Sequence, residues 1–224
     1  MIDPAATAVI YDLDGTLIRG DSGTRLVRAL LARHGWRRAL ALLIAPIALP
    51  LMLRVSTRHW GVRPMLWIAT VGMDQAALDT FMEVFMRDYR IRWIAPVLTS
   101  LRADLAAGRR VVVATGAFQD LAERIIASLA LDHLAPQVVG ASLRPWAGGF
   151  TVDQGANGVR KLWRLAEAGI LPPFAEVWTD SEADLPLLQA AAVGHWVSED
   201  GQAPKRILAR FPGIIRHSVP RERR

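Results

Sequence analysis

Three short runs of apolar and β-branched residues are each followed at once by polar residues that can do chemistry. With a fourth run nearer the C-terminus, the predicted strands are Thr7–Tyr11, Arg110–Ala114, Glu176–Thr179 and His195–Val197, and a final strand is expected around Ile214. Helical patterns follow two of these runs, at Phe118–Ala130 and Ala183–Ala192. Short buried strands that alternate with helices are typical of a parallel sheet covered on both faces. We therefore expect an α/β fold with a doubly wound parallel sheet, a Rossmann-like core, whose ligands lie at the carboxyl ends of the strands.

The segment between the first strand and the helix before the second strand is long enough to form a small domain. Helical patterns occur within it at Ser22–Arg33 and Gln75–Tyr89. An insertion of this length between neighbouring elements is expected to fold separately. The sequence therefore predicts a catalytic core made of residues 1–17 and 96–224, with an α-helical cap, residues 18–95, inserted after the first strand.

Composition limits the chemistry that the chain can perform. The 224 residues include no cysteine, which excludes disulfides, thiolate metal sites and cysteine nucleophiles. The formal net charge of +6 is uneven, because nine arginines stand against one acid, Asp21, between Arg19 and Pro64. Such a basic segment suggests an anionic partner, either a phosphate surface or a nucleic acid. A general preference for arginine fits equally well, since the chain has 25 arginines and two lysines.

The segment YDLDGTL, residues 11–17, carries the strongest chemical signal. Asp12 and Asp14 leave the end of one predicted strand together, close enough to share one metal ion and one phosphate. Gly15 permits the turn that lets a phosphoryl group approach, and Thr16 can hydrogen-bond across that turn. One carboxylate can act as a nucleophile that forms an aspartyl-phosphate while the other protonates the leaving oxygen. The structural alternative is an ordinary strand followed by an Asp-Gly turn.

Three further elements contain candidate site residues. Thr115 and Gly116 follow the second strand, where a hydroxyl and an amide can hold phosphate oxygens. Lys161 is one of two lysines in an arginine-dominated chain, which suggests a need for a compact ammonium charge, although a solvated helical lysine is the simpler interpretation. Asp180 and Asp184 lie four residues apart after the third strand, where both could face one hard cation or serve as helix N-caps.

In this order the four elements resemble the haloacid dehalogenase superfamily, whose motifs are DxDGT, a strand-end Ser or Thr, a Lys and an acidic pair. The resemblance covers residues 7–20 and 95–200. It implies that Asp12 is the nucleophile and Asp14 the general acid and base. The remaining roles that it implies are phosphate binding by Thr115, Gly116 and Lys161, magnesium binding by Asp12, the Asp14 carbonyl and Asp180, and support from Thr16 and Asp184.

One residue departs from the superfamily pattern. Thr179 stands where the family often has Gly before the metal-binding Asp. We expect this difference to affect the shape of the loop more than the chemistry. The oxygen ligands do not distinguish magnesium from manganese.

An uncharged segment of the predicted cap indicates a membrane surface. Ala39–Leu53 is apolar and contains Pro46 and Pro50. As a helix it would extend about 22 Å, less than a bilayer core of about 30 Å, and the prolines are expected to break it. Arginines and tryptophans flank it, namely Arg37, Arg38, Arg54, Arg58, Trp36, Trp60 and Trp67. We therefore expect residues 36–60 to contact an anionic membrane peripherally or monotopically, with a buried cap core or a dimer interface as alternatives.

The cap also resembles that of phosphatidylglycerophosphatase C and its relatives, in which a segment like MLWIATVG, residues 65–72, follows a basic, tryptophan-containing stretch. This resemblance implies a phosphatase that acts on a lipid-linked phosphate monoester, such as phosphatidylglycerol-phosphate, at the cytoplasmic face of the membrane. No signal peptide is expected, because the first ten residues lack a basic start. Two alternatives remain: a soluble small-metabolite phosphatase of the phosphoserine phosphatase kind, and a non-catalytic module that binds anionic surfaces. No nucleic acid partner is expected for the enzyme.

Overall fold

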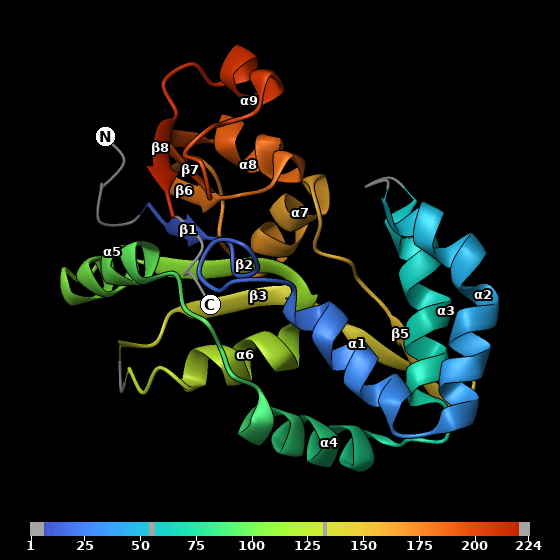
Figure 1. Ribbon diagram of the computed structural model, residues 1–224. Helices are drawn as coiled ribbons and strands as arrows, with labels where there is room; N and C mark the ends of the chain where they lie inside the picture. Colours follow the sequence, from blue (N-terminus) through green and yellow to red (C-terminus); the bar gives the residue numbers. More distant parts are fainter. Residues whose placement is uncertain (1–6, 54–56, 132–133, 220–224) are drawn as a thin grey trace. The chain divides into compact units, whose positions relative to one another are not determined.

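The computed structural model describes residues 7–53, 57–131 and 134–219, and the chain forms two compact units (Figure 1). The core unit comprises Met1–Gly20, Ile91–Gly140 and Ala156–Arg224, and the helical unit comprises Asp21–Arg90 and Ala141–Gly155. The helical unit therefore takes in residues 141–155, which the sequence analysis assigned to the core. The reason is a hairpin in this segment that packs against a helix of the helical unit, where the Phe150 amide donates to Thr70 Oγ1 at 2.9 Å.

The core unit contains a six-stranded sheet in the order β3-β2-β1-β6-β7-β8. Its strands are β1 (Val9–Tyr11), β2 (Val111–Phe118), β3 (Gln137–Ala141), β6 (Phe174–Thr179), β7 (Ala191–Ser198) and β8 (Ile215–Ser218). The pairs β1–β2, β1–β6, β6–β7 and β7–β8 are parallel. The predicted α/β fold with a Rossmann-like parallel sheet is confirmed, and β3 is a strand that the sequence analysis missed.

Helices cover both faces of this sheet (Figure 1). They are α5 (Ala95–Ala106), α6 (Gln119–Ala127), α7 (Val159–Glu167), the 3-10 helix η2 (Glu182–Asp184), α8 (Leu185–Gln189) and α9 (Lys205–Arg210). On one face, Leu165, Leu187 and Ile207 from α7, α8 and α9 pack in one core cluster with Ile10 and Val112 of the sheet. On the other face, the Tyr11 hydroxyl donates to Asp104 of α5 at 2.6 Å.

The central position of β1 determines where the catalytic candidates lie. Tyr11 is in register with Val113 of β2 and with Trp178 of β6. The residues that follow these three positions therefore lie at the same edge of the sheet, which is the carboxyl edge at which ligands bind in such folds. Strand β2 continues to Phe118, so Thr115 and Gly116 lie inside a strand that was predicted to end at Ala114.

Within its described residues, the helical unit combines four helices with a β-hairpin. Its elements are α1 (Ser22–Ala32), α2 (Gly35–Leu53), α3 (Arg58–Thr70), α4 (Gln75–Asp88), β4 (Leu143–Trp146) and β5 (Gly149–Val152). The hairpin turns at Ala147 and Gly148, which both have positive φ, as a two-residue turn between antiparallel strands requires. Helices α1 and α4 agree with the helical patterns in the sequence, whereas the hairpin was not predicted.

Helix α2 corrects the expectation that its prolines would break it. It is continuous over 19 residues and therefore extends about 28 Å. Pro46 and Pro50 are exposed, whereas Ala41 and Ala48 are buried. Gly61 of α3 allows close approach, because a Cβ atom there would collide with the Ala48 carbonyl oxygen. The backbone hydrogen bonds that the prolines remove thus lie on the exposed side of α2. Packing against α3 stabilises the buried side of the helix.

Not all basic residues in and near α2 are available to bind an anionic surface. Arg37 is 4% exposed, and its guanidinium donates to the carbonyl oxygens of Ala69 at 2.8 Å and Val71 at 2.6 Å, at the end of α3. A cation at a helix C-terminus satisfies carbonyl groups that have no partner within the helix. Arg37 thus joins α2 to α3 within the helical unit, and Arg54, another of the flanking arginines, lies outside the described residues.

Candidate active site

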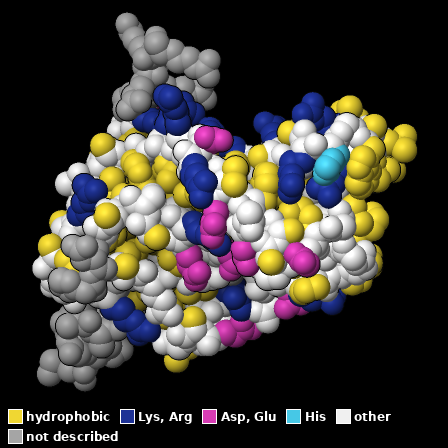
Figure 2. All heavy atoms as spheres, turned by 90° about the horizontal axis from the view of Figure 1, so that it is seen from below, with side chains coloured by type: hydrophobic (Ala, Val, Ile, Leu, Met, Phe, Trp, Pro, Cys, Tyr) yellow, Lys and Arg dark blue, Asp and Glu magenta, His cyan; other side chains and the backbone are white. Residues whose placement is uncertain are grey.

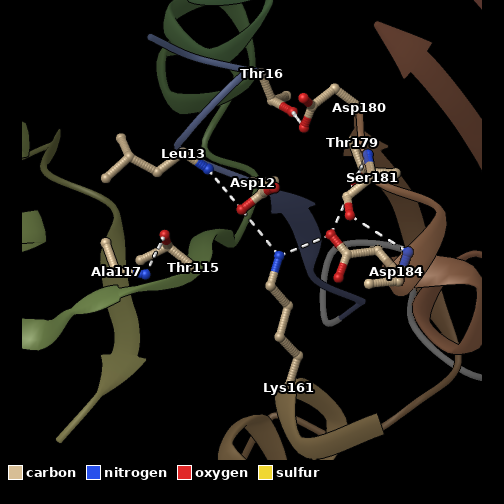
Figure 3. A network of polar contacts seen from close by, with 11 residues as sticks. Asp12, Leu13, Thr16, Thr115, Ala117, Lys161, Thr179, Asp180, Ser181 and Asp184 are labelled. Atoms are coloured by element: carbon tan, nitrogen blue, oxygen red, sulfur yellow. Dashed lines mark hydrogen bonds and ion pairs between the residues drawn. The ribbon is translucent and has the colours of Figure 1, made fainter. Parts of the chain in front are cut away.

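The Asp12 carboxylate is fixed directly after β1 by backbone groups (Figure 3). Its own amide donates to the Trp178 carbonyl oxygen at 2.9 Å, which continues the pairing of β1 with β6. Its Oδ1 accepts a hydrogen bond from the Leu13 amide at 2.9 Å. Asp12 is 8% exposed, so few water molecules can solvate this charge. The predicted nucleophile is therefore a buried carboxylate held in one orientation.

Lys161 supplies the positive charge beside Asp12. Its Nζ lies 2.9 Å from Asp12 Oδ1 and 2.7 Å from Asp184 Oδ2, and the side chain is 5% exposed. Burial alone would lower the pKa of Lys161, but the charges of Asp12 and Asp184 raise it above its ordinary value. The ammonium therefore stays protonated, and the interpretation of Lys161 as a solvated helical lysine is wrong.

The turn after β1 places Asp180 beside the nucleophile. Gly15 has φ +81°, and a Cβ atom there would collide with the Asp180 carboxylate. Thr16 Oγ1 donates to Asp180 Oδ1 at 3.3 Å. The sequence suggested a hydrogen bond from Thr16 across its own turn. The Thr16 hydroxyl instead donates to the loop after β6. Asp14, in the same turn, is half-buried, and its backbone bridges to Ile18.

The carboxylates of this cluster carry more negative charge than Lys161 can balance. Burial and the charge of Asp12 raise the pKa of Asp180 above its ordinary value. Burial also raises the pKa of Asp12, while Lys161 acts in the opposite direction. Carboxylates that disfavour ionisation in one another's presence provide a site at which a cation is stabilised.

These residues fit a magnesium ion. Mg²⁺ is usually held by one or two carboxylates, with water and substrate phosphate completing its shell. Asp12 and Asp180, with the Asp14 carbonyl group, provide such a donor set. Over the part of the chain that the structure describes, no group of three or more His, Asp or Glu side chains is arranged to hold a metal. The ion would therefore depend on the backbone carbonyl and on substrate oxygens.

Asp184 contacts Lys161 and Thr179 through one carboxylate oxygen. Its Oδ2 accepts hydrogen bonds from Lys161 Nζ at 2.7 Å and from Thr179 Oγ1 at 2.8 Å, and the residue is 1% exposed. The Ser181 amide in turn donates to Thr179 Oγ1 at 3.0 Å. Thr179 was expected to affect the shape of the loop more than the chemistry, and its hydroxyl also contacts a carboxylate of the site directly.

Thr115 and Gly116 lie on β2, and in Figure 3 Thr115 lies on the side of Asp12 away from Asp180. Thr115 is fully buried, and its hydroxyl accepts a hydrogen bond from the Ala117 amide at 3.0 Å, which leaves its own proton to donate. A Cβ atom at Gly116 would collide with Asn157 Oδ1. The Asn157 side chain therefore lies over Gly116, a neighbour that the sequence analysis missed although Asn-Gly directly precedes the helix of Lys161.

The fold and the site together define a class: a Rossmann-like protein with a buried acidic cluster and one lysine at the carboxyl edge of its sheet. The model of the haloacid dehalogenase-like hydrolase family matches residues 9–189, most of the chain, and the chain belongs to this family. The predicted superfamily is thus confirmed.

Solved structures agree with this assignment. A protein of unknown function from Bordetella pertussis Tohama I has a TM-score of 0.67 and 24% identity, over 93% of this chain and 97% of that chain. A substrate-bound phosphoserine phosphatase complex has a TM-score of 0.57 and 13% identity, over 93% of this chain and 92% of that chain. A phospho-aspartyl intermediate analogue of phosphoserine phosphatase has a TM-score of 0.56 and 14% identity with the same coverages. These likenesses establish the fold, and with the family match they support the prediction of a phosphatase.

Proposed function

We propose that this chain is a phosphatase that hydrolyses phosphate monoesters through an aspartyl-phosphate on Asp12. The observation that carries the proposal is the buried ion pair between Asp12 Oδ1 and Lys161 Nζ, 2.9 Å apart. A carboxylate whose charge is stabilised but whose oxygen is not consumed by protonation can attack phosphorus. The same ammonium can bind the phosphoryl oxygens as they approach, which lowers the repulsion between two anions.

The proposed chemical steps use the two aspartates of the first motif. An Asp12 oxygen attacks phosphorus, the bond from phosphorus to the ester oxygen breaks, and Asp14 gives its proton to that leaving oxygen. Asp14 then takes a proton from water, whose oxygen attacks the phosphoryl group and breaks its bond to Asp12. Inorganic phosphate leaves, and both carboxyl groups return to their starting states. Thr115 and the Gly116 amide donate to phosphoryl oxygens throughout.

Magnesium belongs to this proposal through Asp12, Asp180 and the Asp14 carbonyl group, which would hold it. When bound, the ion draws electron density from the phosphoryl oxygens and offsets the negative charge of the cluster. Thr16 holds Asp180 in place by its hydrogen bond of 3.3 Å. Asp184 shares the Lys161 ammonium with Asp12 and helps to keep this charge buried in the site.

The substrate that we propose is a lipid-linked monoester, such as phosphatidylglycerol-phosphate, at the cytoplasmic face of an anionic membrane. The support is the surface of the helical unit. Several large apolar side chains of α2 are exposed, as is one at the start of α3: Trp36, Leu42, Leu43, Ile47, Leu49, Leu53 and Trp60. We call these seven residues the α2 patch. In Figure 2 hydrophobic side chains gather at the right-hand edge, with Lys and Arg beside them.

A membrane is the occupant that best fits the α2 patch. Apolar side chains beside arginines suit an interface between acyl chains and anionic headgroups. Within the described residues α2 is also the helix that is long and apolar enough to cross a membrane, by length and composition, and little of it is buried. The exposed Trp36 and Trp60 add side chains that favour the headgroup region.

A soluble monoester is the second candidate substrate. It is favoured by the similarity of the fold to structures named phosphoserine phosphatase. In that case the α2 patch would have a different partner, such as a second copy of the chain.

Phosphate release from vesicles that contain phosphatidylglycerol-phosphate tests the proposal, with magnesium present and soluble monoesters assayed in parallel. We expect rapid release from the lipid and none with Asp12→Asn. Turnover of soluble esters alone would retain the phosphatase and overturn the lipid substrate. Absence of turnover on every ester would overturn the enzymatic proposal and favour a module that binds anionic surfaces.

A further inference from the structure

Thr179 connects the two halves of the acidic motif through one buried hydroxyl. The residue is fully buried at the end of β6. Its Oγ1 donates to Asp184 Oδ2 at 2.8 Å and accepts from the Ser181 amide at 3.0 Å. A hydroxyl has a single proton, and an ionised carboxylate can only accept, so the direction of both hydrogen bonds is determined.

The oxygen that Thr179 contacts is the oxygen that holds Lys161. Asp184 Oδ2 receives the Lys161 ammonium at 2.7 Å, and the same ammonium reaches Asp12 at 2.9 Å (Figure 3). Lys161 therefore divides its charge between a supporting carboxylate and the nucleophile. A second donor on Asp184 Oδ2 reduces the negative charge that pulls Lys161 away from Asp12.

We propose that Thr179 is a positioning residue, whose hydroxyl shares the charge of Asp184 and so keeps the Lys161 ammonium on Asp12 and the incoming phosphoryl group. The catalytic part of this inference rests on the function proposed above, whereas the placement of Lys161 does not. The hydroxyl also holds the Ser181 amide, and with it the backbone next to Asp180.

Two substitutions separate the hydroxyl from the shape of the side chain. Thr179→Val keeps the branched shape and removes the hydroxyl, and Thr179→Ser keeps the hydroxyl. We expect Thr179→Val to lower kcat about tenfold or more with little change in KM, because a hydrogen bond to a charged group is lost at the reacting centre. We expect Thr179→Ser to restore most of kcat.

Thr70→Val is a matched control. The Thr70 hydroxyl is also buried, donates to the Leu66 carbonyl oxygen at 2.8 Å and accepts from the Phe150 amide at 2.9 Å, within the helical unit. Its loss should lower the stability of the protein without lowering kcat. Thermal unfolding of all variants shows whether each is folded at the assay temperature.

A second measurement follows the environment of the Lys161 ammonium and does not require turnover. The chain has two lysines, Lys161 and the exposed Lys205, so lysine labelled with ¹⁵N gives two side-chain signals. The buried ammonium is protected from exchange, and its signal should shift in Thr179→Val but not in Thr179→Ser or Thr70→Val. In an Asp184→Asn background, Thr179→Val should have no further effect, because both substitutions act through the same contact.

The kinetics and the Lys161 signal together distinguish failure of the proposed function from failure of the positioning role of Thr179. If the wild type hydrolyses no monoester, the proposed function fails and the Lys161 signal still decides the role of Thr179. The positioning role is overturned if folded Thr179→Val leaves the Lys161 signal and kcat unchanged. It is also overturned if Thr179→Ser is as damaging as Thr179→Val.

Discussion

The Asp180 carboxylate occupies the space in which a Cβ atom of residue 15 would lie. Gly15 is therefore required for two reasons, its φ of +81° and the absence of a side chain. We predict that Gly15→Ala displaces Asp180 from Thr16 and Asp12 and lowers kcat about a hundredfold, because misplacing a group at the reacting centre has a large effect. Steady-state kinetics at saturating magnesium measures this.

Gly72→Ala is the matched control for that variant. Gly72 has the same φ of +81°, but a Cβ atom there meets nothing within 4 Å. It should therefore show the backbone strain alone, as a modest loss of stability with kcat retained. Equal kcat for Gly15→Ala and the wild type would contradict the proposed use of Asp180.

Removal of Lys161 leaves two buried carboxylates without their counter-charge. We predict that Lys161→Met abolishes turnover and destabilises the fold by about 3 kcal/mol at neutral pH, the usual magnitude for breaking a buried pair. Burial already raises the pKa of Asp12 above its ordinary value, and without the ammonium this pKa rises further in the folded state. The variant should therefore regain stability as the pH falls, since carboxyl groups with raised pKa values favour folding when protonated.

Urea unfolding between pH 5 and pH 8 checks this second prediction, with the exposed Lys205→Met as the control. Lys205→Met should match the wild type at each pH. A Lys161→Met protein that is as stable as the wild type at neutral pH would show that the ion pairs do not support the fold.

His195 and His217 predict a loss of stability in mild acid. Their rings are joined by a contact of 3.0 Å between His195 Nδ1 and His217 Nε2, and His195 stacks on Trp178 at 3.9 Å between centroids. Burial lowers the pKa of both histidines, although Glu176 acts against this at His195. The unfolded chain therefore binds protons more readily, so stability is complete above pH 6.5 and falls as the pH drops below it.

Unfolding experiments at pH 7.5 and pH 5.5 measure this loss, and His217→Gln should reduce it. Burial raises the pKa of Glu176, but Arg109 lowers it by more, so the net pKa lies below its ordinary value. The stability that Glu176 contributes is therefore lost only at more acidic pH, below about 4.5. An unchanged free energy of unfolding between pH 7.5 and pH 5.5 would contradict the assignment.

The α2 patch predicts binding to vesicles. Replacement of Leu43, Ile47 and Leu53 by Gln should weaken partitioning into phosphatidylglycerol vesicles about a hundredfold or more, because each large apolar side chain contributes up to about 2 kcal/mol when buried. Turnover of a soluble monoester should not change. Leu171→Gln, at an exposed leucine of the core unit, is the control and should bind as the wild type does. Equal vesicle binding by the triple variant would exclude the patch as the membrane contact.

The strands and the main acidic cluster were predictable because their signals are local. Asp12, Lys161, Asp180 and Asp184 follow apolar runs or lie on short helices, and the parallel sheet brings the strand ends together. The continuity of α2 was not predictable, because it depends on α3 packing against the side of the helix away from Pro46.

Two other features also required the structure. The role of Thr179 depends on a hydrogen bond to a side chain five residues later, which a sequence pattern does not specify. The hairpin of β4 and β5 has a turn at Ala147 and Gly148, whose left-handed backbone is usual for Gly and unusual for Ala.

The most direct test of the account is the identity of the atom that receives the phosphoryl group. With p-nitrophenyl phosphate, whose leaving group departs without a proton from Asp14, Asp14→Asn should slow hydrolysis of the phosphoryl-enzyme more than its formation. A reaction quenched in acid should then carry one phosphoryl group on the peptide that contains Asp12, detectable by mass spectrometry. We predict that the phosphoryl group is found on Asp12 and is absent from a variant that also carries Asp12→Asn. Phosphorylation of another residue, or continued turnover by Asp12→Asn, would contradict it.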